Sequence, residues 1–151
     1  MRRIPTREEI NPVAEDLDGQ MALKHFYGKS QSEAAKLFFG PELDAMNYID
    51  DLRWMGSKAF SFYFPSVEPY LLSQESKEDS NAINVMIGVL EGRMEFDPLS
   101  IKECLADVLR ILTYVSGNMA KFNADPEIYG DLAGELDCLI EKVRTMETED
   151  N

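Results

Sequence analysis

The stretch AFSFYFPSVEPYLL, residues 59–72, is the most hydrophobic part of this chain of 151 residues. Pro65 and Pro69 interrupt it, so we expect a helical or extended segment that is broken at both prolines. It is too short and too interrupted to span a membrane, which takes about 20 apolar residues. We therefore predict that residues 59–72 fill the centre of the core.

Amphipathic helical patterns surround this segment on both sides. Capping boxes at residues 6–9 and 30–33 mark two helix starts, and the Asp-Pro pairs at 97–98 and 125–126 mark two more. The expected helices cover about residues 13–26, 31–39, 41–55, 80–95, 98–115 and 126–147. No alternating strand pattern competes. We predict an all-α, single-domain bundle of six or seven helices over residues 1–151, with residues 1–5 and 148–151 flexible.

The last predicted helix has the clearest apolar stripe, which should face the core. Its members are Ile128, Leu132, Leu136, Leu139, Ile140, Val143 and Met146. We expect the last three helices to pack together around residues 59–72.

The charge of the chain is distributed unevenly along its length. Residues 1–30 contain five bases and five acids, whereas the remaining 121 residues carry 10 bases and 23 acids. The whole formal net charge of -13 therefore belongs to the chain after residue 30. Such a body repels nucleic-acid phosphates and anionic lipid headgroups and attracts basic partners. We expect neither nucleic acid nor a membrane as a partner.

The cysteine content indicates a reducing compartment. Cys104 and Cys138 are too few for a disulfide framework. We expect Cys104 to be a core thiol and Cys138 to lie on the polar flank of its helix. Residues 1–5 are basic, but no hydrophobic segment follows them, so we expect no secretory signal. These features predict a cytoplasmic protein.

No catalytic or cofactor-binding signature stands out. His25 is the only histidine, which excludes histidine-rich metal sites, and we expect it to have a structural role near a helix C-terminus. Glu75 and Glu78 form a Glu-x-x-Glu pair of the kind used by all-α nucleotide pyrophosphohydrolases, but no Glu-x-x-Asp follows within reach. The sequence predicts no catalytic residue, no metal ligand and no cofactor, and it favours a protein that is not an enzyme.

The predicted helix at residues 41–55 carries the best candidate binding surface. Its side opposite the core gathers acidic and amide groups around the only tryptophan. A basic side chain could pair with the acids while its aliphatic stem lies on the indole, as in many protein–protein hot spots. We predict a partner-binding site at Asp44, Asn47, Asp50, Asp51 and Trp54. The competing interpretation, which the pattern favours for the indole itself, is that another helix covers Trp54.

The stretch YIDDLRWMGSKAFSFYFP, residues 48–65, resembles a pattern found in small bacterial proteins of unknown function. In those proteins a helix ends in a Leu-x-x-Met or Leu-x-x-Leu step, followed by Ala-Phe and a Tyr-Tyr-Leu-Pro-like segment. Here LRWM (52–55) forms the step, and FYFP (62–65) takes the last place. The resemblance, over about residues 48–72, implies an α-helical bacterial protein and assigns no functional residue.

Three functions from different classes remain. The leading hypothesis is a non-enzymatic binding protein whose acidic helical surface engages a basic protein partner. Its concrete form is a bacterial immunity protein or antitoxin that neutralises a toxin such as a nuclease. The first alternative is a metal-dependent hydrolase built on carboxylates in a helical bundle. The second is a homo-oligomeric scaffold with residues 59–72 as its interface, and the sequence leaves the oligomeric state open.

Overall fold

The computed structural model describes residues 3–149, and within this range the chain is helical and has no strand. Its α-helices are α1 (Arg7–Ile10), α2 (Leu17–Phe26), α3 (Gln31–Leu37), α4 (Ala45–Asp51), α5 (Ser57–Tyr63), α6 (Glu68–Leu72), α7 (Ser80–Phe96), α8 (Pro98–Lys102), α9 (Leu105–Gly117), α10 (Met119–Phe122), α11 (Pro126–Tyr129) and α12 (Leu132–Glu149). Short 3-10 turns are η1 (Leu52–Trp54), η2 (Phe64–Val67) and η3 (Gln74–Ser76). The predicted all-α fold class is confirmed. The segments outnumber the six or seven expected, because several predicted helices are interrupted.

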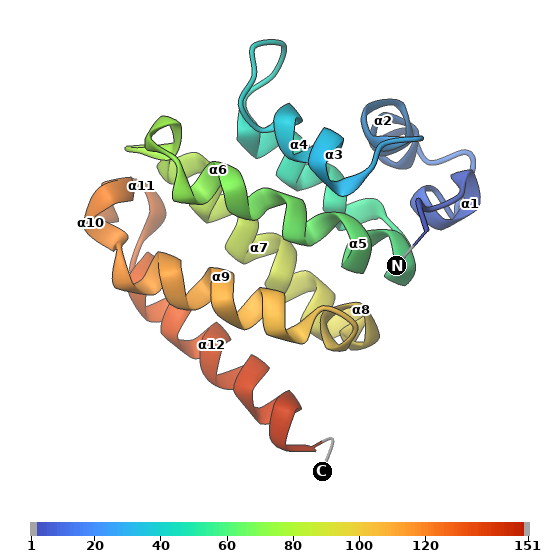
Figure 1. Ribbon diagram of the computed structural model, residues 1–151. Coiled ribbons are helices and arrows are strands. Elements are labelled where there is room, and N and C mark those ends of the chain that lie inside the picture. Colours follow the sequence, from blue (N-terminus) through green and yellow to red (C-terminus); the bar gives the residue numbers. More distant parts are fainter. Residues whose placement is uncertain (1–2, 150–151) are drawn as a thin grey trace.

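Helix α7 runs through the middle of the molecule (Figure 1). It packs against α4, α8 and α12, while α9 packs along α12. In Figure 1 the helices α1 to α4 lie above α7, and α9 and α12 lie below it. Helix α12 therefore contacts both other long helices, as expected from its apolar stripe.

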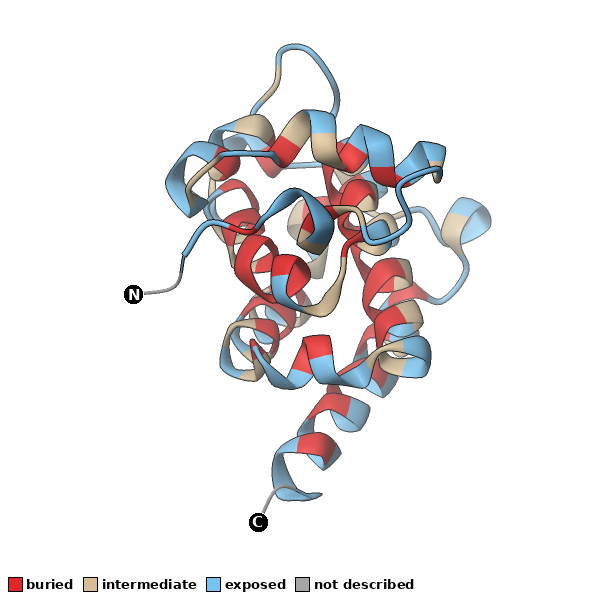
Figure 2. Ribbon diagram, turned by 90° about the vertical axis from the view of Figure 1, so that its right-hand side faces the viewer, coloured by how far each residue is buried: buried red, intermediate tan, exposed pale blue. Residues whose placement is uncertain are grey.

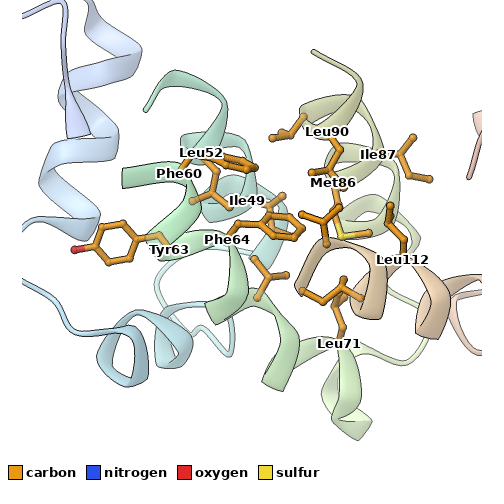
Figure 3. Packing of buried hydrophobic residues seen from close by; sticks show 14 of the residues in the cluster. Ile49, Leu52, Phe60, Tyr63, Phe64, Leu71, Met86, Ile87, Leu90 and Leu112 are labelled. Atoms are coloured by element: carbon orange, nitrogen blue, oxygen red, sulfur yellow. The ribbon is translucent and has the colours of Figure 1, made fainter. Parts of the chain in front are cut away.

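Most of the segment 59–72 lies in the core, as predicted, although Pro69 is exposed and Leu72 is 52% exposed. Phe60, Tyr63 and Phe64 have no exposed surface, and Figure 3 shows them directed towards the helices packed on this segment. The Tyr63 hydroxyl donates to the backbone oxygens of Phe26 at 2.9 Å and Lys29 at 2.8 Å. Figure 2 shows the buried positions along the inward sides of the helices. The aromatic segment thus packs in the core, and through the Tyr63 hydroxyl it also holds the C-terminal end of α2 in place.

The predicted helix at residues 41–55 is shorter than expected. Gly40 has a φ of +78°, which favours glycine, and the chain then forms an exposed loop as far as Asp44. Helix α4 begins only at Ala45, and its C-terminal end tightens into η1. This loop between α3 and α4 projects from the top of the molecule (Figure 1).

Two further predicted helices are interrupted. Cys104 adopts a non-helical conformation and separates α8 from α9, and it is buried as expected, whereas Cys138 is exposed. Gly130 has a φ of +71° and separates α11 from α12. Ile128 was therefore wrongly assigned to the apolar stripe, since it is 71% exposed. The other stripe members are buried: Leu132, Leu136, Leu139, Ile140, Val143 and Met146.

The two predicted capping boxes are present, at Thr6 with Glu9 and at Ser30 with Glu33. Of the segments expected to be flexible, residues 1–2 and 150–151 lie outside the described part. Arg3 pairs with Glu9 at 2.7 Å, and residues 148–149 belong to α12. Between residues 3 and 149, no helix is both long enough and apolar enough for a membrane span.

A buried arginine joins α7 to the end of the α4–η1 segment. The Arg93 side chain is 7% exposed, and its Nη1 donates to the backbone oxygens of Met55 at 2.6 Å and Arg53 at 3.2 Å. Its Nε donates to Ser100 Oγ at 3.0 Å, and its Nη2 pairs with Asp97 at 2.9 Å. Burial lowers the pKa of Arg93, against the opposing effect of the Asp97 carboxylate. Arg93 therefore holds the end of η1, which contains Trp54, and the start of α5 in position against α7.

Candidate functional site

The five residues predicted for partner binding do not share one exposed surface. Asp44 is exposed at the N-cap of α4, and Asn47 is exposed one turn later. Asp50 accepts a hydrogen bond from Arg53 Nε at 3.0 Å, so its charge is partly neutralised. Trp54, in η1, keeps 38% of its surface exposed, so neighbouring segments cover most of the indole but not all of it.

Asp51 is not on the exposed side of α4, and the expectation that it is was wrong. Its side chain is buried and its Oδ2 lies 2.5 Å from His25 Nδ1, because α2 packs over this end of α4. Burial raises the pKa of Asp51 to about 6, and the hydrogen bond from His25 opposes that shift. The His25 ring also meets Tyr48 edge-on at 5.1 Å. The buried contact between Asp51 and His25 therefore links α4 to α2.

Asp44 lies instead at a cavity of about 500 Å³. The loop between α3 and α4 borders it on one side, and the segment from η3 to the start of α7 borders it on the other. We call it the Asp44 cavity. Its lining includes two exposed apolar side chains, Phe39 and Leu43, which are 43% and 37% exposed. Its other notable lining residues are Tyr70 and the charged residues Asp44, Glu75, Lys77, Glu78 and Asp79.

The wall of the Asp44 cavity is held in place by Tyr70. Its hydroxyl donates to Asp79 Oδ2 at 2.5 Å, and the other Asp79 oxygen caps α7 by accepting from the Ala82 amide at 3.2 Å. The ring of Phe39 meets the Tyr70 ring at 5.4 Å and nearly at a right angle. The two aromatic rings therefore join the α3–α4 loop to the start of α7.

The field inside the Asp44 cavity is negative. Tyr70 has a raised pKa, first because it is buried and then because of its hydrogen bond to Asp79 and the charges of Asp79, Asp44 and Glu75. Among the described residues, the carboxylates of Asp44, Glu75 and Glu78 have no hydrogen-bond or ion-pair partner. Among the lining residues that the structure describes, Lys77 is the one base. Carboxylates from two separate segments, Asp44 and Glu75, therefore act on the same hydroxyl, and neither forms an ion pair with a described residue.

The Glu-x-x-Glu pair of the hydrolase alternative lies at this same place. Glu75 belongs to η3 and Glu78 to the turn that follows, where its φ is +66°. Across residues 3–149, no group of three or more His, Cys, Asp and Glu side chains is arranged to hold a metal ion.

No family model, no curated protein and no solved structure matches this chain. The resemblance of residues 48–72 to small bacterial proteins of unknown function therefore stays a prediction.

Proposed function

We propose that this protein is a non-enzymatic binding protein that engages a positively charged segment of another protein through the Asp44 cavity and the neighbouring outer side of α4. The observation that carries the proposal is the set of three unpaired carboxylates, Asp44, Glu75 and Glu78, around one cavity with exposed apolar residues in its wall. Unpaired charges keep their full attraction for a partner, whereas Asp50 and Asp51 are already engaged by Arg53 and His25.

The electrostatics of the whole chain support the same partner chemistry. With a net charge of -13, the chain attracts a basic protein at long range, and the unpaired carboxylates define where that protein docks. A bacterial immunity protein or antitoxin, which neutralises a basic toxin, is the biological form that we propose. The proposal includes a cytoplasmic location, which is supported because Cys104 and Cys138 do not form a disulfide with each other.

A binding assay with a defined basic probe tests this proposal. The probe is a fluorescein-labelled hexa-arginine peptide, and its anisotropy is followed during titration with the protein. We expect saturable binding that weakens as NaCl is raised from about 50 to about 300 mM, because salt screens the charges. A variant that combines Asp44→Asn, Glu75→Gln and Glu78→Gln should bind at least about tenfold more weakly.

The matched control removes the same number of charges elsewhere. Glu91→Gln, Glu95→Gln and Glu135→Gln change exposed carboxylates that do not line the Asp44 cavity. We expect this variant to lose less than about threefold in affinity, through the net charge alone. Equal losses in the two variants, or no saturable binding to the wild-type protein, would overturn the proposal.

A further inference from the structure

The Asp44 cavity is large enough to admit a side chain of a partner protein. Its volume of about 500 Å³ falls in the range of pockets that hold small ligands, and it combines an apolar wall with charged groups. The apolar wall is not a closed part of the core, because Phe39 and Leu43 keep 43% and 37% of their surface exposed. A ligand in the cavity can therefore bury part of both side chains.

The charged groups of the cavity differ in what they can offer a ligand. Both oxygens of Asp79 are used, one by the Tyr70 hydroxyl and one by the α7 cap. Asp44 and Glu75 come from opposite borders of the cavity, and both act on the Tyr70 hydroxyl. Their free oxygens can thus approach one bound cation from two sides.

A planar cation fits this combination better than a compact one. A guanidinium group is weakly hydrated, lies on aromatic rings and forms paired hydrogen bonds with carboxylates, whereas an ammonium group is a strongly hydrated point charge. Phe39 supplies the exposed ring, and Asp44 and Glu75 supply the carboxylates. Lys77 repels a cation bound in the cavity, so its effect on the binding affinity can be tested by removing its charge.

We infer that the Asp44 cavity binds one arginine side chain of the basic partner. This inference rests on the proposed function and deepens it, because it names the group that the cavity recognises. The guanidinium lies beside Phe39 and pairs with Asp44 and Glu75, and the adjoining backbone of the partner lies across the α3–α4 loop. Arginine rather than general positive charge then sets the affinity at this position.

The test uses three small probes, each a single residue blocked at both ends: N-acetyl-arginine amide, N-acetyl-lysine amide and N-acetyl-citrulline amide. Citrulline keeps the shape of arginine but carries no charge. Binding is followed by amide chemical shifts of the ¹⁵N-labelled protein. We expect saturable shifts at residues 38–46 and 75–81, with a dissociation constant on the order of 1 mM for the arginine probe. The lysine probe should bind at least about threefold more weakly, and citrulline should not saturate.

Single variants connect the probe to particular side chains. Phe39→Leu keeps an apolar residue at an exposed position and should reduce the affinity for arginine to about that for lysine. Asp44→Asn should weaken arginine binding at least about threefold, and Lys77→Gln should strengthen it about twofold. Glu135→Gln is the control and should change nothing. Amide spectra of the free variants confirm that each is folded.

The outcomes separate this inference from the proposed function. Saturable, local shifts with the preference arginine over lysine support it. Equal affinity for arginine and lysine, shifts spread over distant acidic helices, or saturation by Mg²⁺ without saturation by arginine would overturn it. In those cases hexa-arginine binding that still depends on Asp44, Glu75 and Glu78 would leave the proposed function standing. Loss of that dependence would remove both.

Discussion

Replacing Arg93 by methionine should destabilise the fold strongly, although Arg93 does not line the Asp44 cavity. The change removes the donors to Met55 O and Arg53 O, at 2.6 and 3.2 Å, while it keeps most of the aliphatic stem. Asp97 loses less, because its carboxylate still accepts from the Ser57 hydroxyl and is 34% exposed. The loss is therefore concentrated in the two backbone oxygens at the end of η1.

The magnitude follows from those two acceptors. A buried polar group without a partner costs about 1–3 kcal/mol, so two of them, together with the lost ion pair, give about 3–5 kcal/mol. In urea unfolding, with a slope of about 2 kcal/mol per molar, the midpoint should fall by about 2 M. The residues of η1 and the start of α5 should show the largest loss of amide protection.

The matched control is Arg144→Met. Arg144 is 56% exposed, and its Nη1 lies 3.6 Å from Glu141, so this pair should contribute less than about 0.5 kcal/mol. If Arg93→Met and Arg144→Met unfold at midpoints within about 0.3 M of each other, Arg93 does not hold η1 and α5 in place as described.

Three other consequences of the structure can be measured. Because burial raises the pKa of Asp51 from 3.8 to about 6, its ionised form costs stability above that range, and the cost disappears as pH falls from about 6 to about 4. Thermal unfolding should therefore show the wild-type protein gaining stability relative to Asp51→Asn over this interval, and a relative loss would refute the assignment. Gly130→Ala should cost about 1–3 kcal/mol at a φ of +71°, whereas Gly117→Ala, where an added Cβ meets no atom within 4 Å, should be neutral or stabilising in the same assay. Trp54 should be quenched more by caesium than by iodide, because the indole is 38% exposed on a protein of net charge -13; the reverse order would place it in a cationic environment.

Local sequence patterns were sufficient to predict where a helix begins when a capping box precedes it. The capping boxes at Thr6 and Ser30 act over three residues, and both are present. Most of the apolar segment at 59–72 was placed correctly, because burying so many aromatic side chains in the core is strongly favourable. The stop at Gly40 was predicted, whereas the late start of α4 at Ala45 and the break at Gly130 were not. A glycine within a helical pattern, such as Gly130, is compatible with either continuation of the helix or a turn.

Which of the predicted site residues are exposed depends on contacts between helices, and the periodicity of one helix does not predict those contacts. Asp44 and Asp51 are seven residues apart and share one side of an ideal helix, but α2 covers only the second of them. The partner of Asp51, His25, was expected near a helix C-terminus, where it is, yet its ion pair crosses from α2 to α4. Burial of Asp51 thus depends on which helices pack together.

The other side of the Asp44 cavity was missed for a related reason. Residues 74–79 lie outside the predicted helices, and Asp79 was not predicted to cap α7. Tyr70 was assigned to the core, which is correct for its ring, but its hydroxyl reaches Asp79. The signal that could have identified this region is the run of acids directly before a long helix, close to an aromatic residue.

The most direct test of the account compares the affinity of hexa-arginine for the two charge-matched triple variants at one salt concentration. If the Asp44 cavity is the docking site, removing Asp44, Glu75 and Glu78 weakens binding at least about threefold more than removing the same charge from α7 and α12. If the two variants bind hexa-arginine equally well, the attraction belongs to the net charge of the chain, and the cavity has no part in it.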